Sequence, residues 1–286
     1  MTPFSGGEID YQALGELIER QVEAGVTGVV PCGSTGESAT LSHEEHERLI
    51  AFTVERASGR VQVIAGTGSN STSESVRLTR FAKQQGATGA LLIAPYYNKP
   101  TQEGLYAHYA KVAESVDLPQ LVYNIPGRSA VNITPETMAR LAELPHVVGV
   151  KEASGSLDQV SRIIEACGEH FTVLSGDDSL TLPILAVGGR GVIAVVSNLA
   201  PRPLIELVQA AHEGSWPRAR QLHYQLLPLM RALGLETNPI PVKAAIGLLG
   251  WASDELRLPL TPLREACHAP LRAALVQAKL LPDVKG

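Results

Sequence analysis

The chain has 286 residues, of which 44% are hydrophobic, and a formal net charge of -5 at pH 7. This composition predicts a globular protein with a large core, and the length suits one α/β barrel as well as two smaller domains. The negative charge and the lack of any basic block argue against nucleic acids and membrane surfaces as partners. We therefore expect partners that are small molecules or further copies of this chain.

The opening segment and the cysteines indicate a cytoplasmic protein. Residues 1–10 are acidic and turn-like, which is unlike a signal peptide, and no apolar run approaches the roughly 18 residues that a membrane span requires. Cys32, Cys167 and Cys267 share no spacing typical of disulfides or metal sites. We expect reduced thiols.

Short apolar runs alternate with longer amphipathic segments over the first two thirds of the chain. The pattern predicts strands at 26–32, 61–66, 89–94, 120–124, 147–151, 171–175 and 191–196. It predicts helices at 11–24, 43–57, 72–85, 103–116, 135–144 and 157–167. Seven repeats of strand then helix indicate a parallel sheet and favour a closed (β/α) barrel over a doubly wound sheet.

From residue 203 onward the pattern is helical, with predicted helices at 216–233, 242–249 and 263–278. We therefore divide the chain into a barrel, residues 1–202, and a C-terminal helical appendage packed on it, residues 203–286. A closed barrel of this class has eight strands, but only seven are visible. Either the protein begins upstream of Met1, or the barrel lacks its first strand and keeps an open seam with unpaired edges.

Lys151 ends an apolar run that reads as a strand buried on both faces. Burial disfavours an ammonium and favours the free amine, which condenses with a ketone to form a Schiff base. The alternative is an ordinary solvated lysine at the end of a strand. The other predicted strands also end in polar residues, and the carboxyl ends of barrel strands meet at one face. This shared polar face favours the interpretation of Lys151 as a nucleophile.

Three of these strand ends bear on the kind of ligand. GSTGES at 33–38 lacks the Gly-Lys-Ser/Thr of a phosphate loop, and GTGSNS at 66–71 lacks the third glycine of a dinucleotide fingerprint. Carboxylates are therefore the expected ligands of these loops. Tyr96 and Tyr97 fit either core aromatics or a loop at the barrel mouth, and the polar residues that follow them favour the loop.

The sequence HEEH at 43–46 places two histidines three residues apart, which differs from the His-Glu-x-x-His zinc motif. A pair on the surface of a helix is the simpler interpretation, and we predict no metal.

Several motifs together carry a family resemblance. They are GSTGESATL at 33–41, PYYNKP at 95–100, QEGLY at 102–106, YNIPGR at 123–128, GVKEASG at 149–155, SGDD at 175–178 and NPIPVK at 238–243. In this order they resemble the 4-hydroxy-tetrahydrodipicolinate synthases, also called dihydrodipicolinate synthases. These enzymes belong to the superfamily of pyruvate-dependent class I aldolases that includes N-acetylneuraminate lyase.

The resemblance implies a (β/α)8 TIM barrel, a homotetramer built as a dimer of dimers, and a condensation of pyruvate with L-aspartate-4-semialdehyde that needs no cofactor. By the resemblance, Lys151 forms the imine with pyruvate. Tyr123 is the general acid/base, connected through Ser34 to Tyr97 of a neighbouring subunit. The substrate-binding residues that it implies are Thr35 for the pyruvate carboxylate, Arg128 for the semialdehyde carboxylate, and the backbones of Gly176 and Ile193.

The resemblance also implies a site for L-lysine as a feedback inhibitor, formed by Ser38, Ala39, His43, His46, Asn70, Glu74 and Tyr96. The chain departs from the family at Ser34, where threonine is usual, so the hydroxyl is kept without the methyl group that restricts its rotamer. Two alternatives remain open. One is a sister lyase acting on a sugar acid, such as N-acetylneuraminate lyase, and the other is a barrel that binds a metabolite without catalysis.

Overall fold

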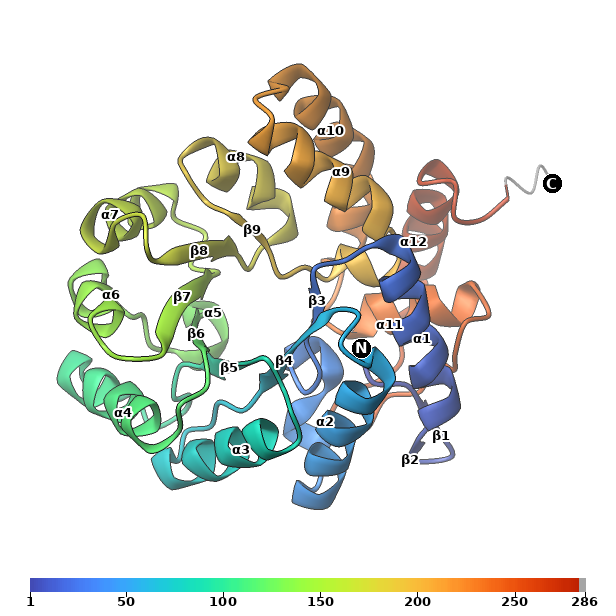
Figure 1. Cartoon of the computed structure of the whole chain (residues 1–286). Coiled ribbons are helices and arrows are strands. Elements are labelled where there is room, and N and C mark those ends of the chain that lie inside the picture. Colours follow the sequence, from blue (N-terminus) through green and yellow to red (C-terminus); the bar gives the residue numbers. More distant parts are fainter. Residues whose placement is uncertain (283–286) are drawn as a thin grey trace.

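The computed structural model describes residues 1–282 as a ring of parallel strands surrounded by helices (Figure 1). Seven strands pair in chain order, from β3 to β9, and every pairing is parallel. Their bounds are β3 Gly28–Val29, β4 Gln62–Gly66, β5 Gly89–Ile93, β6 Gln120–Asn124, β7 Val147–Glu152, β8 Thr172–Ser175 and β9 Gly191–Val192. The predicted barrel of seven strands is confirmed.

The ring has an open seam between β3 and β9. Within residues 1–282, β3 pairs only with β4, and β9 pairs only with β8. Both strands are shorter than predicted, because an edge strand has ladder hydrogen bonds on one side only. A cavity of about 740 Å³ follows the seam and is lined by residues of β3, of β9 and of the flanking helices α1 (Tyr11–Ala24) and α9 (Pro201–His212).

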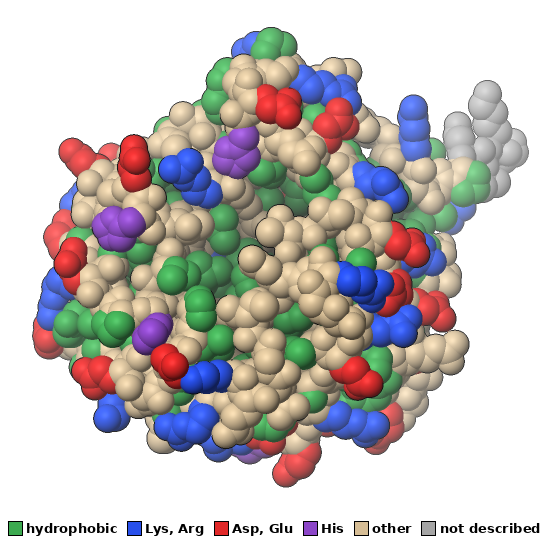
Figure 2. All heavy atoms as spheres, viewed as in Figure 1, with side chains coloured by type: hydrophobic (Ala, Val, Ile, Leu, Met, Phe, Trp, Pro, Cys, Tyr) green, Lys and Arg blue, Asp and Glu red, His purple; other side chains and the backbone are tan. Residues whose placement is uncertain are grey.

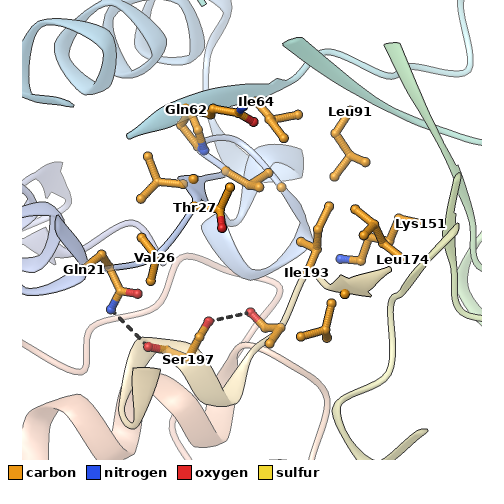
Figure 3. Close-up of a pocket in the computed structure, with 18 of the residues that line it drawn as sticks. Gln21, Val26, Thr27, Gln62, Ile64, Leu91, Lys151, Leu174, Ile193 and Ser197 are labelled. Carbon is orange, nitrogen blue, oxygen red and sulfur yellow. Dashed lines mark hydrogen bonds between the residues drawn. The ribbon is translucent and has the colours of Figure 1, made fainter. Parts of the chain in front are cut away.

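Hydrogen bonds bridge the seam at a few points. The side chain of Gln21 on α1 donates to the Ser197 carbonyl at 3.0 Å (Figure 3). The terminal ammonium of Met1 donates to Oδ1 of Asn198 at 2.9 Å, and the Thr2 hydroxyl donates to the Gly36 carbonyl at 2.7 Å. Residues 1 and 2 therefore occupy the end of the seam beside the glycine-rich loop.

The remaining barrel helices are α2 (His43–Ala57), α3 (Thr72–Gln84), α4 (Gln102–Ser115), α5 (Pro126–Ser129), α6 (Pro135–Ala142), α7 (Leu157–Cys167) and α8 (Thr181–Ala186). The bounds of α1, α2 and α7 agree with the prediction because each begins at a side-chain cap. Asp10 accepts from the Ala13 amide, Ser42 forms a capping box with Glu45, and Ser156 accepts from the Gln159 amide.

Two features of the fold were not predicted. The turn-like opening contains a small antiparallel hairpin, β1 (Phe4–Ser5) and β2 (Glu8–Ile9), whose turn is made by Gly6 and Gly7 at positive φ. The short helices α5 and α8 have too few turns to produce a helical periodicity in the sequence.

Four helices make up the C-terminal region: α9, α10 (Trp216–Ala232), α11 (Ile240–Leu248) and α12 (Glu265–Gln277). Helix α9 begins at Pro201, so the division predicted after residue 202 falls inside a helix. Val196 and Leu199, which follow β9, share one apolar cluster with residues of α10, α11 and α12. Among the residues described, no helix has the length and apolar character to cross a membrane.

Candidate active site

Lys151 and Tyr123 lie side by side because β6 and β7 pair in parallel with these two residues in register. Registered partners in a sheet project to the same face, and here both line the cavity inside the barrel. The Lys151 amine lies 4.2 Å from the centre of the Tyr123 ring. Figure 3 shows Lys151 pointing into the cavity beside Leu174 of β8 and Ile193, the residue that follows β9. Figure 2 shows a hollow at the centre of the ring with apolar side chains inside it.

The electrostatic surroundings of Lys151 favour a free amine. Burial lowers the pKa of Lys151 to about 8, and the positive charge of Arg128 acts in the same direction, while the negative charge of Asp178 raises it. The interpretation of Lys151 as an ordinary solvated lysine is therefore not supported by its environment. A lysine with this pKa has a useful fraction of nucleophilic amine near neutral pH.

Gly176 makes room for the stem of Lys151. A Cβ atom at this position would lie 2.8 Å from the Ala153 Cβ and 3.1 Å from both Cγ and Cε of Lys151. A side chain at 176 would therefore displace the lysine. The amide of Gly176 donates to the Glu152 carbonyl at 2.8 Å, and that of Ile193 donates to the Ser175 carbonyl at 2.9 Å. Both amides are therefore already engaged within the sheet.

Tyr123 is a buried phenol with a polar neighbour. Burial raises the pKa of Tyr123, while the charge of Arg128 and a hydrogen bond with the Ser34 side chain oppose that rise. The phenol is therefore protonated at neutral pH and can donate a proton. Ser34 begins the short turn η1 (Ser34–Gly36), which follows β3 at the mouth of the barrel.

Tyr97, the other member of the predicted relay, lies outside the cavity. Its side chain is 88% exposed, and its backbone has a φ of 74°, a conformation that is uncommon for a residue with a side chain. Within one chain the structure brings Lys151, Tyr123, Ser34 and Thr35 together but leaves Tyr97 apart. Its contribution from a neighbouring subunit stays a prediction.

Asn238 connects the two predicted carboxylate-binding residues. Its side-chain amide donates to the Thr35 hydroxyl at 2.9 Å, and its backbone carbonyl accepts from Nη2 of Arg128 at 2.9 Å. Arg128 lies on α5, with its side chain toward solvent. No role was predicted for Asn238 from the sequence. Its only signal was its place at the start of a resembling motif, because the residues it contacts are distant in sequence.

Asp178 is a second site residue that the sequence analysis missed. It accepts hydrogen bonds from the amides of Val195, at 3.0 Å, and Val196, at 2.6 Å. Burial nevertheless raises the pKa of its carboxyl group, which the two amides and Lys151 oppose. Its position just beyond β8, in the polar SGDD sequence, was the available signal.

The residues of the predicted lysine site lie around the start of α2 and α3. Nε2 of His43 lies 3.3 Å from Oε1 of Glu74, and Oε2 of Glu74 accepts a hydrogen bond from the Ser69 hydroxyl. Asn98 donates to the Asn70 carbonyl at 3.0 Å, next to the half-exposed Tyr96. The turn η2 (Ser38–Thr40), which includes Ser38 and Ala39, directly precedes α2.

The prediction of a surface histidine pair is wrong for His46. His46 is only 8% exposed, and its Nε2 lies 2.8 Å from the Gly66 carbonyl at the end of β4. Burial lowers the pKa of His46. His43 is exposed and contacts Glu74 and Arg77 instead. No cluster of three or more His, Cys, Asp or Glu side chains placed to hold a metal occurs in residues 1–282.

Comparisons with known proteins agree with this geometry. The model of the dihydrodipicolinate synthetase family matches residues 1–278. The chain belongs to this family. A 4-hydroxy-tetrahydrodipicolinate synthase of Syntrophus aciditrophicus is 55% identical over 275 residues, which are 96% of this chain and 94% of the relative.

Solved structures of family members have the same fold. The crystal structure of dihydrodipicolinate synthase from Aquifex aeolicus superposes with a TM-score of 0.97 at 52% identity, covering 98% of this chain and 96% of that one. The synthase of Cyanidioschyzon merolae, solved with lysine bound, has a TM-score of 0.96 at 41% identity and covers 98% and 96%. These relatives identify the chain as an enzyme of the lyase class and favour the synthase over both alternatives, the sugar-acid lyase and the non-catalytic barrel.

Proposed function

We propose that this chain condenses pyruvate with L-aspartate-4-semialdehyde to give 4-hydroxy-tetrahydrodipicolinate, a step of lysine and diaminopimelate biosynthesis. The observation that carries the proposal is the Lys151 amine, whose pKa is lowered to about 8 in a cavity that it shares with the Tyr123 phenol. The names of the relatives give the product, and the family resemblance implies the two substrates. The same geometry supports an imine mechanism, because a free amine can condense with a keto acid.

In the proposed reaction, Nζ of Lys151 attacks the keto carbon of pyruvate, and the keto oxygen leaves as water. The positive imine nitrogen draws electrons from the methyl carbon, which loses a proton and becomes the nucleophilic end of an enamine. This carbon attacks the aldehyde, and the resulting alkoxide takes up a proton. The amino group of the second substrate then attacks the imine carbon, which closes the ring and releases Lys151.

Tyr123 is the proposed proton carrier for these steps, since its protonated phenol lies beside the amine and contacts Ser34. Thr35 would hold the pyruvate carboxylate, with its hydroxyl oriented by Asn238. Arg128 would hold the second carboxylate through a charge-assisted pair, since its side chain faces solvent at the mouth of the site. The carbonyls of Gly176 and Ile193 complete the pocket. The reaction needs no cofactor, because the imine is the electron sink.

We infer that the working enzyme is a cytoplasmic homotetramer in which Tyr97 of one subunit reaches the Ser34 of another. Its exposure supports this, because the ring is free to pack against another subunit, and its positive φ is of the kind that clusters at functional sites. We also infer that L-lysine is an effector at the site around His43 and Glu74, since a relative was solved with lysine bound.

Product analysis tests the proposed function. The protein should form 4-hydroxy-tetrahydrodipicolinate from pyruvate and the semialdehyde, and it should not cleave N-acetylneuraminate. Cleavage of the sugar acid would favour the sister lyase instead. Failure to turn over either substrate would favour a non-catalytic barrel.

A further inference from the structure

The buried ion pair between Lys243 and Glu37 is a feature that the proposed reaction leaves unused. Both side chains are 0% exposed, although one is on α11 and the other is in the loop that follows β3. Nζ of Lys243 also donates to the Glu255 carbonyl at 2.7 Å and lies 4.0 Å from the centre of the Phe4 ring. Charges removed from water in this way are costly unless each has a partner. Loss of either partner therefore leaves a buried charge that must neutralise or move.

Glu37 is coupled to the substrate-binding turn through the backbone. It directly follows η1, and its amide donates to the Ser34 carbonyl at 3.1 Å. Its φ of 53° and ψ of 38° are left-handed, a conformation that a residue with a side chain keeps only when its surroundings hold it there. Glu37 is also fixed from the far side, because Oε2 accepts from the Arg257 amide at 3.2 Å. A shift of Glu37 would consequently move Ser34 and Thr35.

Residues 238–243 hold the same turn at two points. At one end, the Asn238 side chain donates to the Thr35 hydroxyl, and at the other, Lys243 pairs with Glu37. This segment is the NPIPVK sequence, to which the sequence analysis assigned no role. Neither Lys243 nor Glu37 lines the cavity that contains Lys151. An effect of the pair on catalysis must therefore pass through the position of the turn.

We propose that Lys243 is a positioning residue, which through Glu37 sets the distance of the Ser34 and Thr35 hydroxyls from Lys151. The keto-acid substrate, and not the semialdehyde, should then be affected by loss of the pair. The inference rests on the proposed function for the identity of that keto acid as pyruvate. Small displacements of positioning groups are costly, since about 1 Å can reduce the rate on the order of a hundredfold.

The test uses two variants and a matched control in the purified full-length enzyme. Lys243→Met removes the buried ammonium, and Lys243→Met combined with Glu37→Gln leaves a neutral pair of similar shape. Lys83→Met is the control, because Lys83 pairs with Asp117 at the surface. For each protein, KM for pyruvate, KM for the semialdehyde, kcat and the melting temperature are measured.

Lys243→Met should raise KM for pyruvate by about tenfold or more, with KM for the semialdehyde within about twofold of the original. The double variant should recover much of the loss in KM, and Lys83→Met should resemble the original protein. A lower melting temperature with both KM values unchanged would overturn the proposal, since it would show a purely structural pair. An equal rise in both KM values would also overturn it.

If Lys243→Met does not fold, Glu37→Gln alone provides the same test. It removes the negative charge of the pair, while the glutamine oxygen can still accept from Lys243 and support folding. It should raise KM for pyruvate selectively, and an unchanged KM would refute the inference. Borohydride trapping separates this inference from the proposed function. If the original protein forms no adduct with pyruvate, the proposed function fails; if it does and the variants keep its KM, only the positioning role fails.

Discussion

The reactivity of Lys151 toward pyruvate should depend on pH with a midpoint near 8. Only the free amine attacks the ketone, and burial lowers the pKa of Lys151 to about 8. At pH 7 this leaves about one lysine in eleven as free amine, whereas an ordinary lysine of pKa about 10.4 would have roughly one in 2,500. The structure therefore predicts a gain of about two hundredfold in reactive amine at pH 7.

Asp178→Asn isolates one cause of this pKa. The negative charge of Asp178 raises the pKa of Lys151, so its removal should lower that pKa and move the midpoint of imine formation to lower pH. Asparagine has nearly the same shape and can still accept from the Val195 amide. Asp158→Asn is a matched control, since Asp158 is exposed at the start of α7.

The assay is the initial rate of borohydride trapping at saturating pyruvate, measured between pH 6 and 10, with the adduct quantified by mass spectrometry. The original protein and Asp158→Asn should share one midpoint, and that of Asp178→Asn should lie lower. A midpoint of the original protein near 10, or an upward shift in Asp178→Asn, would refute the electrostatic account of the site.

Four further predictions test the remaining assignments. Lys151→Ala should abolish the borohydride adduct, and an adduct on Lys99 or Lys243 in the original protein would contradict the nucleophile. Arg128→Ala should leave trapping of pyruvate largely intact while raising KM for the semialdehyde by about tenfold or more, because the lost charge-assisted pair contacts only the second substrate; an equal loss for both substrates would be inconsistent with this role. Adding an extended apolar segment of roughly ten residues before Met1 should raise the melting temperature by several degrees, because it can pair with the free edges of β3 and β9. An unchanged melting temperature would mean that the existing contacts already close the seam. Lysine should inhibit partially at sub-millimolar to millimolar concentration, through a coupling of about 1 to 3 kcal/mol between the two sites, and Glu74→Ala should relieve this inhibition; full activity in about 10 mM lysine would exclude the effector site.

Local signals explain which parts of the fold could be predicted. Helices α1, α2 and α7 have the predicted bounds because a side chain in the sequence caps the start of each. The central strands β4 to β8 agree within one residue at either end because both faces are covered and the apolar runs are continuous. The edge strands β3 and β9 were predicted too long. Their apolar character is that of a buried strand, but in the described part of the chain each has one neighbour with which to form a ladder.

Lys151 could be predicted as the nucleophile from the sequence, whereas the residues that position the site around it could not. Lys151 and Tyr123 each end an apolar strand, and the barrel topology brings such ends together. Asn238 reaches Thr35 across 203 positions, and no local pattern encodes a contact between residues so far apart. For His46 a local pattern was misleading, because its spacing from His43 predicted that both histidines lie on the surface of one helix. Its burial depends on the close approach of that helix to the Gly66 carbonyl of β4, which spacing does not encode.

The seam and the buried pair illustrate how distant segments define this active site. The glycine-rich loop follows β3, which among residues 1–282 pairs with β4 alone, in a two-residue ladder. A loop on such a strand needs other attachments, and the chain provides them from residue 2 and from the segment at the start of α11. Thr2 donates to the Gly36 carbonyl, and residues 238–243 hold Thr35 and Glu37. If the added segment closes the seam, it should therefore also reduce the effect of Lys243→Met on KM for pyruvate, because β3 would then hold the turn more firmly. An undiminished effect would mean that the C-terminal segment positions the turn independently of the barrel edge.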